Sequence, residues 1–132
     1  MQKICKNCGA SPTIKAHLIP RMFCRDVQIG KSHAAQVLPN DTFVVSQSGL
    51  WDSGILCAAC DSKIGELENY ANTVFSTIRN HGSSGSSSYK IVDGVNCSKL
   101  LRFCAAILYK FSVTRPEYGQ IDIGIFKISV ER

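Results

Sequence analysis

Two short stretches decide the fold: ICKNCG at residues 4–9 and LCAACD at residues 56–61. Each contains two cysteines separated by two residues, so one tight turn can direct two thiolates at a metal ion. Structural zinc takes four such ligands at tetrahedral corners. The alternative, that the pairs are redox dithiols or coincidences, needs a separate explanation for each pair. The expected ligands of a structural zinc ion are Cys5, Cys8, Cys57 and Cys60.

The composition suits one small cytoplasmic domain. The chain has 132 residues and is 45% apolar, which allows a modest core, and small domains often recruit a metal to complete it. The odd number of cysteines, seven, and a start without a secretory signal argue against a disulfide framework. No apolar run approaches the roughly 18 residues of a membrane span. We therefore expect a cytoplasmic protein with no membrane partner.

The net charge of +5 is unevenly distributed. Residues 1–25 carry five basic residues and no acid, whereas residues 41–70 carry five acids and one lysine. A basic arm suits a phosphate backbone and an acidic cluster suits a divalent cation, although both are also compatible with ordinary solvated surface. The candidate phosphate contacts are Lys15, Arg21 and Arg25.

Apolar residues at three-and-four spacing predict two long helices, at residues 61–80 and 97–113. Asn96 is the expected N-cap of the second. A short helix is expected at residues 20–27, because proline is tolerated in a first helical turn.

The same pattern predicts which side chains are buried. Cys104 lies on the apolar face of the 97–113 helix and is expected in the core, with Cys24 and Cys97 partly buried. Glu66 and Glu68 are expected to face solvent. None of the three thiols has an obvious basic partner that would make it a nucleophile.

β-branched and aromatic residues predict a strand at 42–46, the alternating residues 121–130 predict another, and residues 89–95 are expected to form a strand or an extended segment. Residues 26–41 are expected to form a loop, and residues 49–54 a turn between two glycines. A cysteine knuckle followed by a second pair at a helix start is the arrangement of a treble clef. The predicted fold class is therefore α+β, a small zinc-bound treble clef with an added C-terminal helix and strand.

This pattern divides the chain into three parts. Residues 1–80 are expected to form the zinc-binding core, and residues 81–88 a serine-glycine loop. Residues 89–132 are expected to form a helix-and-strand extension that packs on the core.

His17 lies in KAHLIPR, residues 15–21, between the first cysteine pair and the expected short helix. Histidine suits a general base, and phosphodiester hydrolysis needs a base to activate water while a cation stabilises the developing charge. Joining the two cysteine pairs would bring Asp52 and Asp61 together, where carboxylates can bind a cation such as Mg²⁺. Structural alternatives stay open: His17 as a structural hydrogen-bonding residue, Asp52 as a turn residue and Asp61 as a helix cap.

CKNC, AHLIPR and GLWDSGILCAACDSKIGELENYA occur in this order within residues 4–72, which resemble the HNH endonuclease superfamily in its four-cysteine zinc branch. More narrowly, the order resembles that of certain bacterial and phage proteins. NCSKLLRFCAAILYKF, at residues 96–111, resembles less specifically the helix that follows the nuclease core.

The resemblance implies a ββα-metal fold in which zinc braces the base of the hairpin. It implies that His17 is the general base, that Asp52 stands where the family has the asparagine that orients this histidine, and that Asp61 lies near the catalytic cation. Two positions depart from the family. Asp52 replaces the asparagine, and Ala16 stands where a carboxylate usually binds the catalytic metal.

The expected function is therefore that of an HNH-like, metal-dependent endonuclease that hydrolyses phosphodiester bonds, with DNA as the expected partner. The alternative is a catalytically degenerate zinc module that binds nucleic acid or a protein, and Ala16 favours it. A third hypothesis, a component of phage–bacterium conflict, rests only on where such sequences occur. The expected location is the cytoplasm of a bacterial cell or of a phage-infected host.

Overall fold

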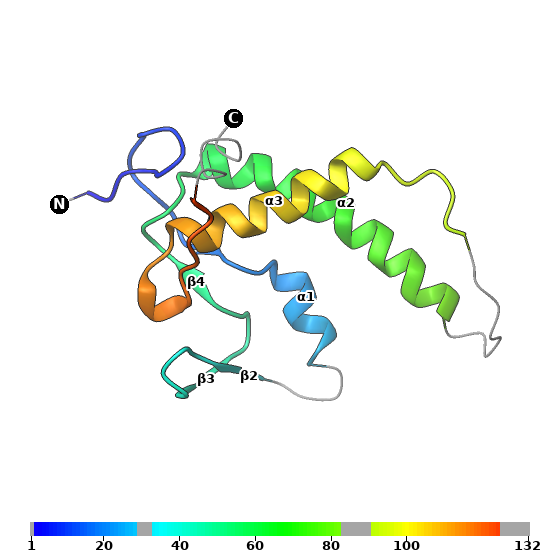
Figure 1. The fold of residues 1–132 in the computed structure, drawn as a ribbon, viewed down its shortest axis with the longest axis horizontal. Coiled ribbons are helices and arrows are strands. Elements are labelled where there is room, and N and C mark those ends of the chain that lie inside the picture. Colours follow the sequence, from blue (N-terminus) through cyan, green and yellow to red (C-terminus); the bar gives the residue numbers. More distant parts are fainter. Residues whose placement is uncertain (1, 29–32, 83–90, 125–132) are drawn as a thin grey trace.

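The computed structural model describes residues 2–28, 33–82 and 91–124, and in these ranges it combines helices with two small antiparallel sheets (Figure 1). This mixed arrangement confirms the predicted α+β class. The elements in chain order are β1 (Ala16–His17), α1 (Arg21–Asp26), β2 (Ala34–Val37), β3 (Phe43–Ser46), β4 (Trp51–Asp52), α2 (Ala58–Gly82), α3 (Cys97–Val113) and a 3-10 turn (Pro116–Tyr118).

The three helices meet in an aromatic cluster. Phe23 of α1 lies 5.6 Å from Phe75 of α2 and 5.8 Å from Phe103 of α3, measured between ring centroids. Edge-to-face and tilted ring pairs of this kind stabilise a fold by about 0.5–1.5 kcal/mol each beyond simple burial. The cluster therefore anchors α1 to the packed pair of α2 and α3 (Figure 1).

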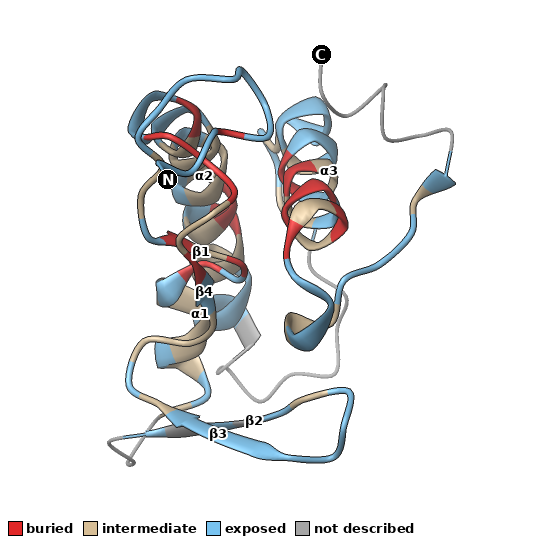
Figure 2. Ribbon diagram, turned by 90° about the vertical axis from the view of Figure 1, so that its left-hand side faces the viewer, coloured by how far each residue is buried: buried red, intermediate tan, exposed pale blue. Residues whose placement is uncertain are grey.

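A short antiparallel ladder ties the start of the chain to the segment that precedes α2. In it β1 pairs with β4, so that His17 lies opposite Trp51. Backbone hydrogen bonds extend the ladder in both directions, from Leu18 N to Leu50 O at 3.0 Å and from Ile14 N to Leu56 O at 2.8 Å. Figure 2 shows buried segments at β1 and β4 and along α3.

The second sheet, β2 with β3, lies apart from the core and is largely exposed (Figure 2). Val37 and Phe43 form a cross-strand pair in it, and they are 58% and 71% exposed. The strand predicted at residues 42–46 is confirmed as β3. The loop predicted at residues 26–41 is wrong in part, because β2 forms there on hydrogen bonds supplied by β3, and its sequence AAQV carries no strand pattern of its own.

The predicted helices are all present. The short helix occupies residues 21–26, and α2 extends the predicted 61–80 helix at both ends. The 97–113 helix is confirmed as α3, and the side-chain oxygen of its N-cap Asn96 accepts a 3.0 Å hydrogen bond from the backbone N–H of Lys99. None of the helices in the described ranges combines the length and the apolar character needed to cross a membrane.

Three other predictions have mixed outcomes. Cys24 is half-buried as expected, but Cys97 and Cys104 are exposed. The apolar stripe of α3 is wider than the face it buries, and Phe103 and Tyr109 turn inward in place of Cys104.

The two predicted extended segments lie only partly in the described ranges. Residues 91–95 and 121–124 form no strand, and the remainder of both segments lies outside the described residues. Of the expected serine-glycine loop, residues 81–82 end α2 and residues 83–88 are outside the described ranges.

Candidate metal centre

Four sulfur atoms, which we call the sulfur cluster, lie within 4.8 Å of one another. Cys5 and Cys8 come from the first knuckle, Cys57 directly precedes α2 and Cys60 lies in its first turn. Thiolates bound to zinc at about 2.3 Å in a tetrahedron are about 3.8 Å apart, and the Sγ atoms of Cys8 and Cys57 are separated by 3.6 Å. The four residues could therefore hold a metal ion such as zinc.

The backbone around the sulfur cluster is hydrogen-bonded across the two stretches. Lys6 N donates to Ile55 O at 2.8 Å, which docks the knuckle onto the segment before α2. Gly9 closes the knuckle with a 2.9 Å bond from its N–H to Cys5 O and has a φ of 75°, a conformation that favours glycine. The side-chain amide of Asn7 donates to Cys60 Sγ at 3.2 Å.

The thiols of the sulfur cluster differ in acidity. Burial opposes ionisation of Cys5, but backbone N–H groups of Cys57, Cys8 and Asn7 outweigh it and lower its pKa to about 6. Burial raises the pKa of Cys60 to about 12, helped by the neighbouring sulfurs and opposed by the amide of Asn7. One thiol of the sulfur cluster therefore ionises readily, whereas the negative charge already present opposes the ionisation of each further thiol. A bound divalent cation removes that penalty.

His17 is half-buried on β1, and its Nε2 is enclosed without a hydrogen-bond partner among the described residues. Burial lowers its pKa, and the charges of Lys15, Lys110 and Arg21 lower it further, while Asp61 opposes them. The ring is therefore neutral at pH 7. That is the protonation state a general base requires.

Asp52 lies in the ladder next to His17, yet its carboxylate is engaged elsewhere. It is 1% exposed; its Oδ1 accepts from Gly54 N at 2.8 Å, and its Oδ2 accepts from Thr114 Oγ1 at 2.8 Å and from Arg115 Nε at 3.4 Å. Burial alone would raise the pKa of Asp52, but these hydrogen bonds and the charge of Arg115 hold it below its usual range. Since Asp52 pairs with the residue before His17, the two side chains leave the ladder on opposite faces.

The carboxylate of Asp61 lies near the ammonium of Lys110 and not, as predicted, beside Asp52. The ammonium of Lys110, on α3, donates to Glu68 Oε1 at 2.6 Å and to His17 O at 2.9 Å, and it lies 3.9 Å from Asp61 Oδ1. We call Lys110, Asp61 and Glu68 the ionic cluster. The side chain of Lys110 is 2% exposed and that of Glu68 is 14% exposed, so the prediction that Glu68 faces solvent is wrong.

The sequence contains a signal for the ionic cluster. Glu68 follows Asp61 by seven residues, which places both on one face of a helix two turns apart. Lys110 stands alone in the apolar run AAILYKF, where a charge needs a buried partner.

The three predicted phosphate contacts are all exposed. Arg21 and Arg25 are four residues apart on α1 and so share a face of that helix. The Lys15 ammonium lies 3.9 Å from the centre of the Trp51 ring, a cation–π contact that leaves the charge at the surface. These side chains are available to an anionic partner.

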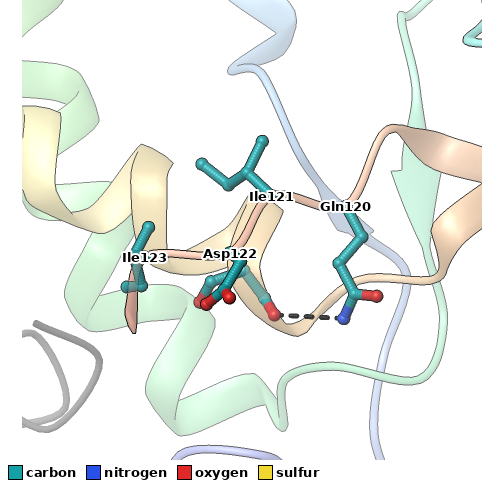
Figure 3. A pocket seen from close by; sticks show the side chains of 5 residues that line it. Gln120, Ile121, Asp122 and Ile123 are labelled. Carbon is teal, nitrogen blue, oxygen red and sulfur yellow. Dashed lines mark hydrogen bonds between the residues drawn. The ribbon is translucent and has the colours of Figure 1, made fainter. Parts of the chain in front are cut away.

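A separate cavity of about 330 Å³ lies between the end of α3 and residues 120–123 (Figure 3). Gln120 lines the cavity and donates a 3.2 Å hydrogen bond from Nε2 to Ser112 O. Among the described residues that line it, none is a candidate site residue.

The described residues do not assemble the carboxylate set expected of a catalytic divalent cation. Ala16 offers no ligand, both oxygens of Asp52 are hydrogen-bonded in a buried position, and Asp61 faces an ammonium group. Comparison with protein-family models, curated proteins and solved structures found no match for this chain.

Proposed function

We propose that the protein is a zinc-braced, HNH-like treble clef of the ββα-metal type that acts on nucleic acid as an endonuclease, with His17 as its general base. The observation that carries this proposal is the place of His17, on β1 beside β4 and joined to the start of α2 through Lys110, which bonds His17 O at 2.9 Å and lies 3.9 Å from Asp61 Oδ1. Burial and the charges of Lys15, Lys110 and Arg21 lower the pKa of His17, which favours the neutral form that a base needs. The chain order of β1, β4 and α2 around the sulfur cluster supports the fold assignment.

In this proposal the chemistry belongs to His17 and to the basic surface. The neutral imidazole takes a proton from a water molecule, whose oxygen then attacks phosphorus, and the leaving oxygen receives a proton from solvent. Lys15, Arg21 and Arg25 bind neighbouring phosphates. The zinc ion is structural, because four thiolates leave it no open coordination position for water or substrate.

A second candidate is a catalytically degenerate zinc module that binds nucleic acid or a protein partner. Two specific observations favour it: Nε2 of His17 is shielded from solvent, and Asp52 is committed to Thr114 and Arg115. An apolar hollow of about 380 Å³, lined in part by Ile19 and Phe75, offers contact area for a protein.

A plasmid-nicking assay with zinc-loaded protein tests the first candidate. Wild-type protein, His17→Ala and His33→Ala are compared in Mg²⁺, Mn²⁺ or Ni²⁺. His33 is exposed, directly precedes β2 and serves as the matched control. We expect nicking by wild type and by His33→Ala, and a loss of about 10²- to 10⁴-fold in His17→Ala. Equal activity in all three proteins rejects the assignment of His17.

The absence of nicking in every cation favours the second candidate, which fluorescence anisotropy then tests. Nucleic-acid binding through phosphates weakens steeply as salt rises. Replacing Lys15, Arg21 and Arg25 by glutamine should lower both the affinity and its salt dependence. Salt-insensitive binding, or none, points to a protein partner.

A further inference from the structure

The ionic cluster holds an internal cation. The Lys110 side chain is almost completely buried, and its ammonium has three N–H donors. It gives hydrogen bonds to Glu68 Oε1 and His17 O and has Asp61 Oδ1 as an additional ionic neighbour. A buried ammonium persists only where carboxylates and carbonyl oxygens compensate for its lost hydration.

The same oxygens are of the kind that bind magnesium or manganese. Both ions take carboxylate and carbonyl oxygens as ligands. Asp61 and Glu68 lie two turns apart on one face of α2, and the ammonium nitrogen of Lys110 lies between them, 2.6 Å from Glu68 Oε1 and 3.9 Å from Asp61 Oδ1. A divalent cation placed there would displace the hydrogen bonds of Lys110 and would be repelled by its charge.

We propose that Lys110 is the built-in cation of this centre, and that it keeps divalent cations away from Asp61 and Glu68. Removing its charge opens a two-carboxylate site for Mg²⁺ or Mn²⁺. This inference goes beyond the proposed function and stands whether or not the protein cleaves nucleic acid. The same ammonium group links the histidine strand to α2, because it bonds both His17 O and Glu68 Oε1.

Manganese binding to the zinc-loaded full chain tests the proposal. Free Mn²⁺ is measured by electron paramagnetic resonance during titration of wild type, Lys110→Met, Glu68→Gln and the double variant Lys110→Met/Glu68→Gln. The control is Lys63→Met, whose lysine is exposed on α2. Methionine keeps the apolar stem of lysine, is one atom shorter and carries no charge. We expect weak, non-stoichiometric binding by wild type and by Lys63→Met, and binding tighter by at least about tenfold in Lys110→Met that is lost in the double variant.

Two results overturn the proposal. One is wild-type protein that binds Mn²⁺ with an affinity that Glu68→Gln reduces. The other is Lys110→Met that circular dichroism shows to be folded and that binds Mn²⁺ no better than wild type. If Lys110→Met does not fold, Lys110→Gln takes its place, and the same gain in Mn²⁺ binding over wild type is required. Because Mn²⁺ binding is read without substrate, its outcome is independent of the nicking assay.

Discussion

Two polar clusters flank the first turns of α2, and they differ in how their negative charge is balanced. The side-chain amide of Asn7 bonds a sulfur of the sulfur cluster but carries no charge to offset a thiolate. In the ionic cluster the ammonium of Lys110 lies directly against Glu68 and close to Asp61. One helix start thus carries a cluster that needs an external cation to hold its ligands ionised, and a second cluster that supplies its own.

Removing one ligand from the sulfur cluster should have the largest effect. We expect Cys57→Ser to lose bound zinc and more than about 4 kcal/mol of unfolding free energy, because the binding energy of a structural zinc ion is folding energy. Urea unfolding followed by circular dichroism measures the loss.

The matched control is Cys104→Ser, since Cys104 is an exposed cysteine on α3 outside the cluster. Its stability should stay within about 0.5 kcal/mol of wild type. If Cys57→Ser and Cys104→Ser were equally stable, the sulfur cluster would contribute no metal-dependent stability. The difference between it and the ionic cluster would then disappear.

Breaking the ionic cluster should have the next largest effect. Lys110→Met leaves the carboxylate of Glu68 half-buried without its partner, and removing one member of a buried ion pair costs about 3–5 kcal/mol. The double variant Lys110→Met/Glu68→Gln should recover part of that loss, because it also removes the stranded charge.

Urea unfolding of the two single variants and the double variant gives the coupling energy. Strictly additive losses would mean that the contact between Lys110 and Glu68 contributes nothing to the fold, contrary to the short hydrogen bond between them.

A third buried charge, outside both clusters, sharpens the comparison. Asp52→Ala leaves the hydroxyl of Thr114 and the N–H of Gly54 without their acceptor, at a cost of about 2–3 kcal/mol. Thr114→Val removes only one donor and should cost about 1 kcal/mol. If both variants unfold at the wild-type urea midpoint, the carboxylate of Asp52 is free for another role, and the site assignment would have to be revised.

The smallest expected effect is a pH dependence that belongs to His17. Its folded pKa lies below the value of 6.5 for an exposed histidine, so the unfolded chain binds more protons as pH falls. The stability contributed by neutral His17 is therefore complete above pH 6.5 and declines as the pH drops toward the folded pKa. We expect His17→Gln to flatten the rise of the urea midpoint between pH 5.5 and 7.5, and a rise as steep as that of wild type would contradict this assignment.

The sequence predicted the parts of the fold that depend on local chemistry. The CxxC turns, the three helices and the cap at Asn96 each follow from spacing within a few residues, and the structure has them. The four cysteines meet because backbone hydrogen bonds such as that between Lys6 and Ile55 join the two stretches.

What the sequence did not reveal depends on contacts between distant elements. Strand β2 forms because β3 pairs with it, although the sequence of β2 has no strong strand preference of its own. The burial of Glu68 follows from Lys110 on another helix, and the burial of Asp52 follows from Thr114 and Arg115 after α3. Periodicity within one element cannot indicate which distant side chain neutralises a charge.

X-ray absorption at the zinc K-edge of the native protein tests the central claim most directly. We predict one zinc ion per chain, surrounded by four sulfur atoms at about 2.3 Å and lost in Cys57→Ser. Native protein without a bound metal, or zinc with nitrogen and oxygen ligands in place of the four sulfurs, would contradict the account.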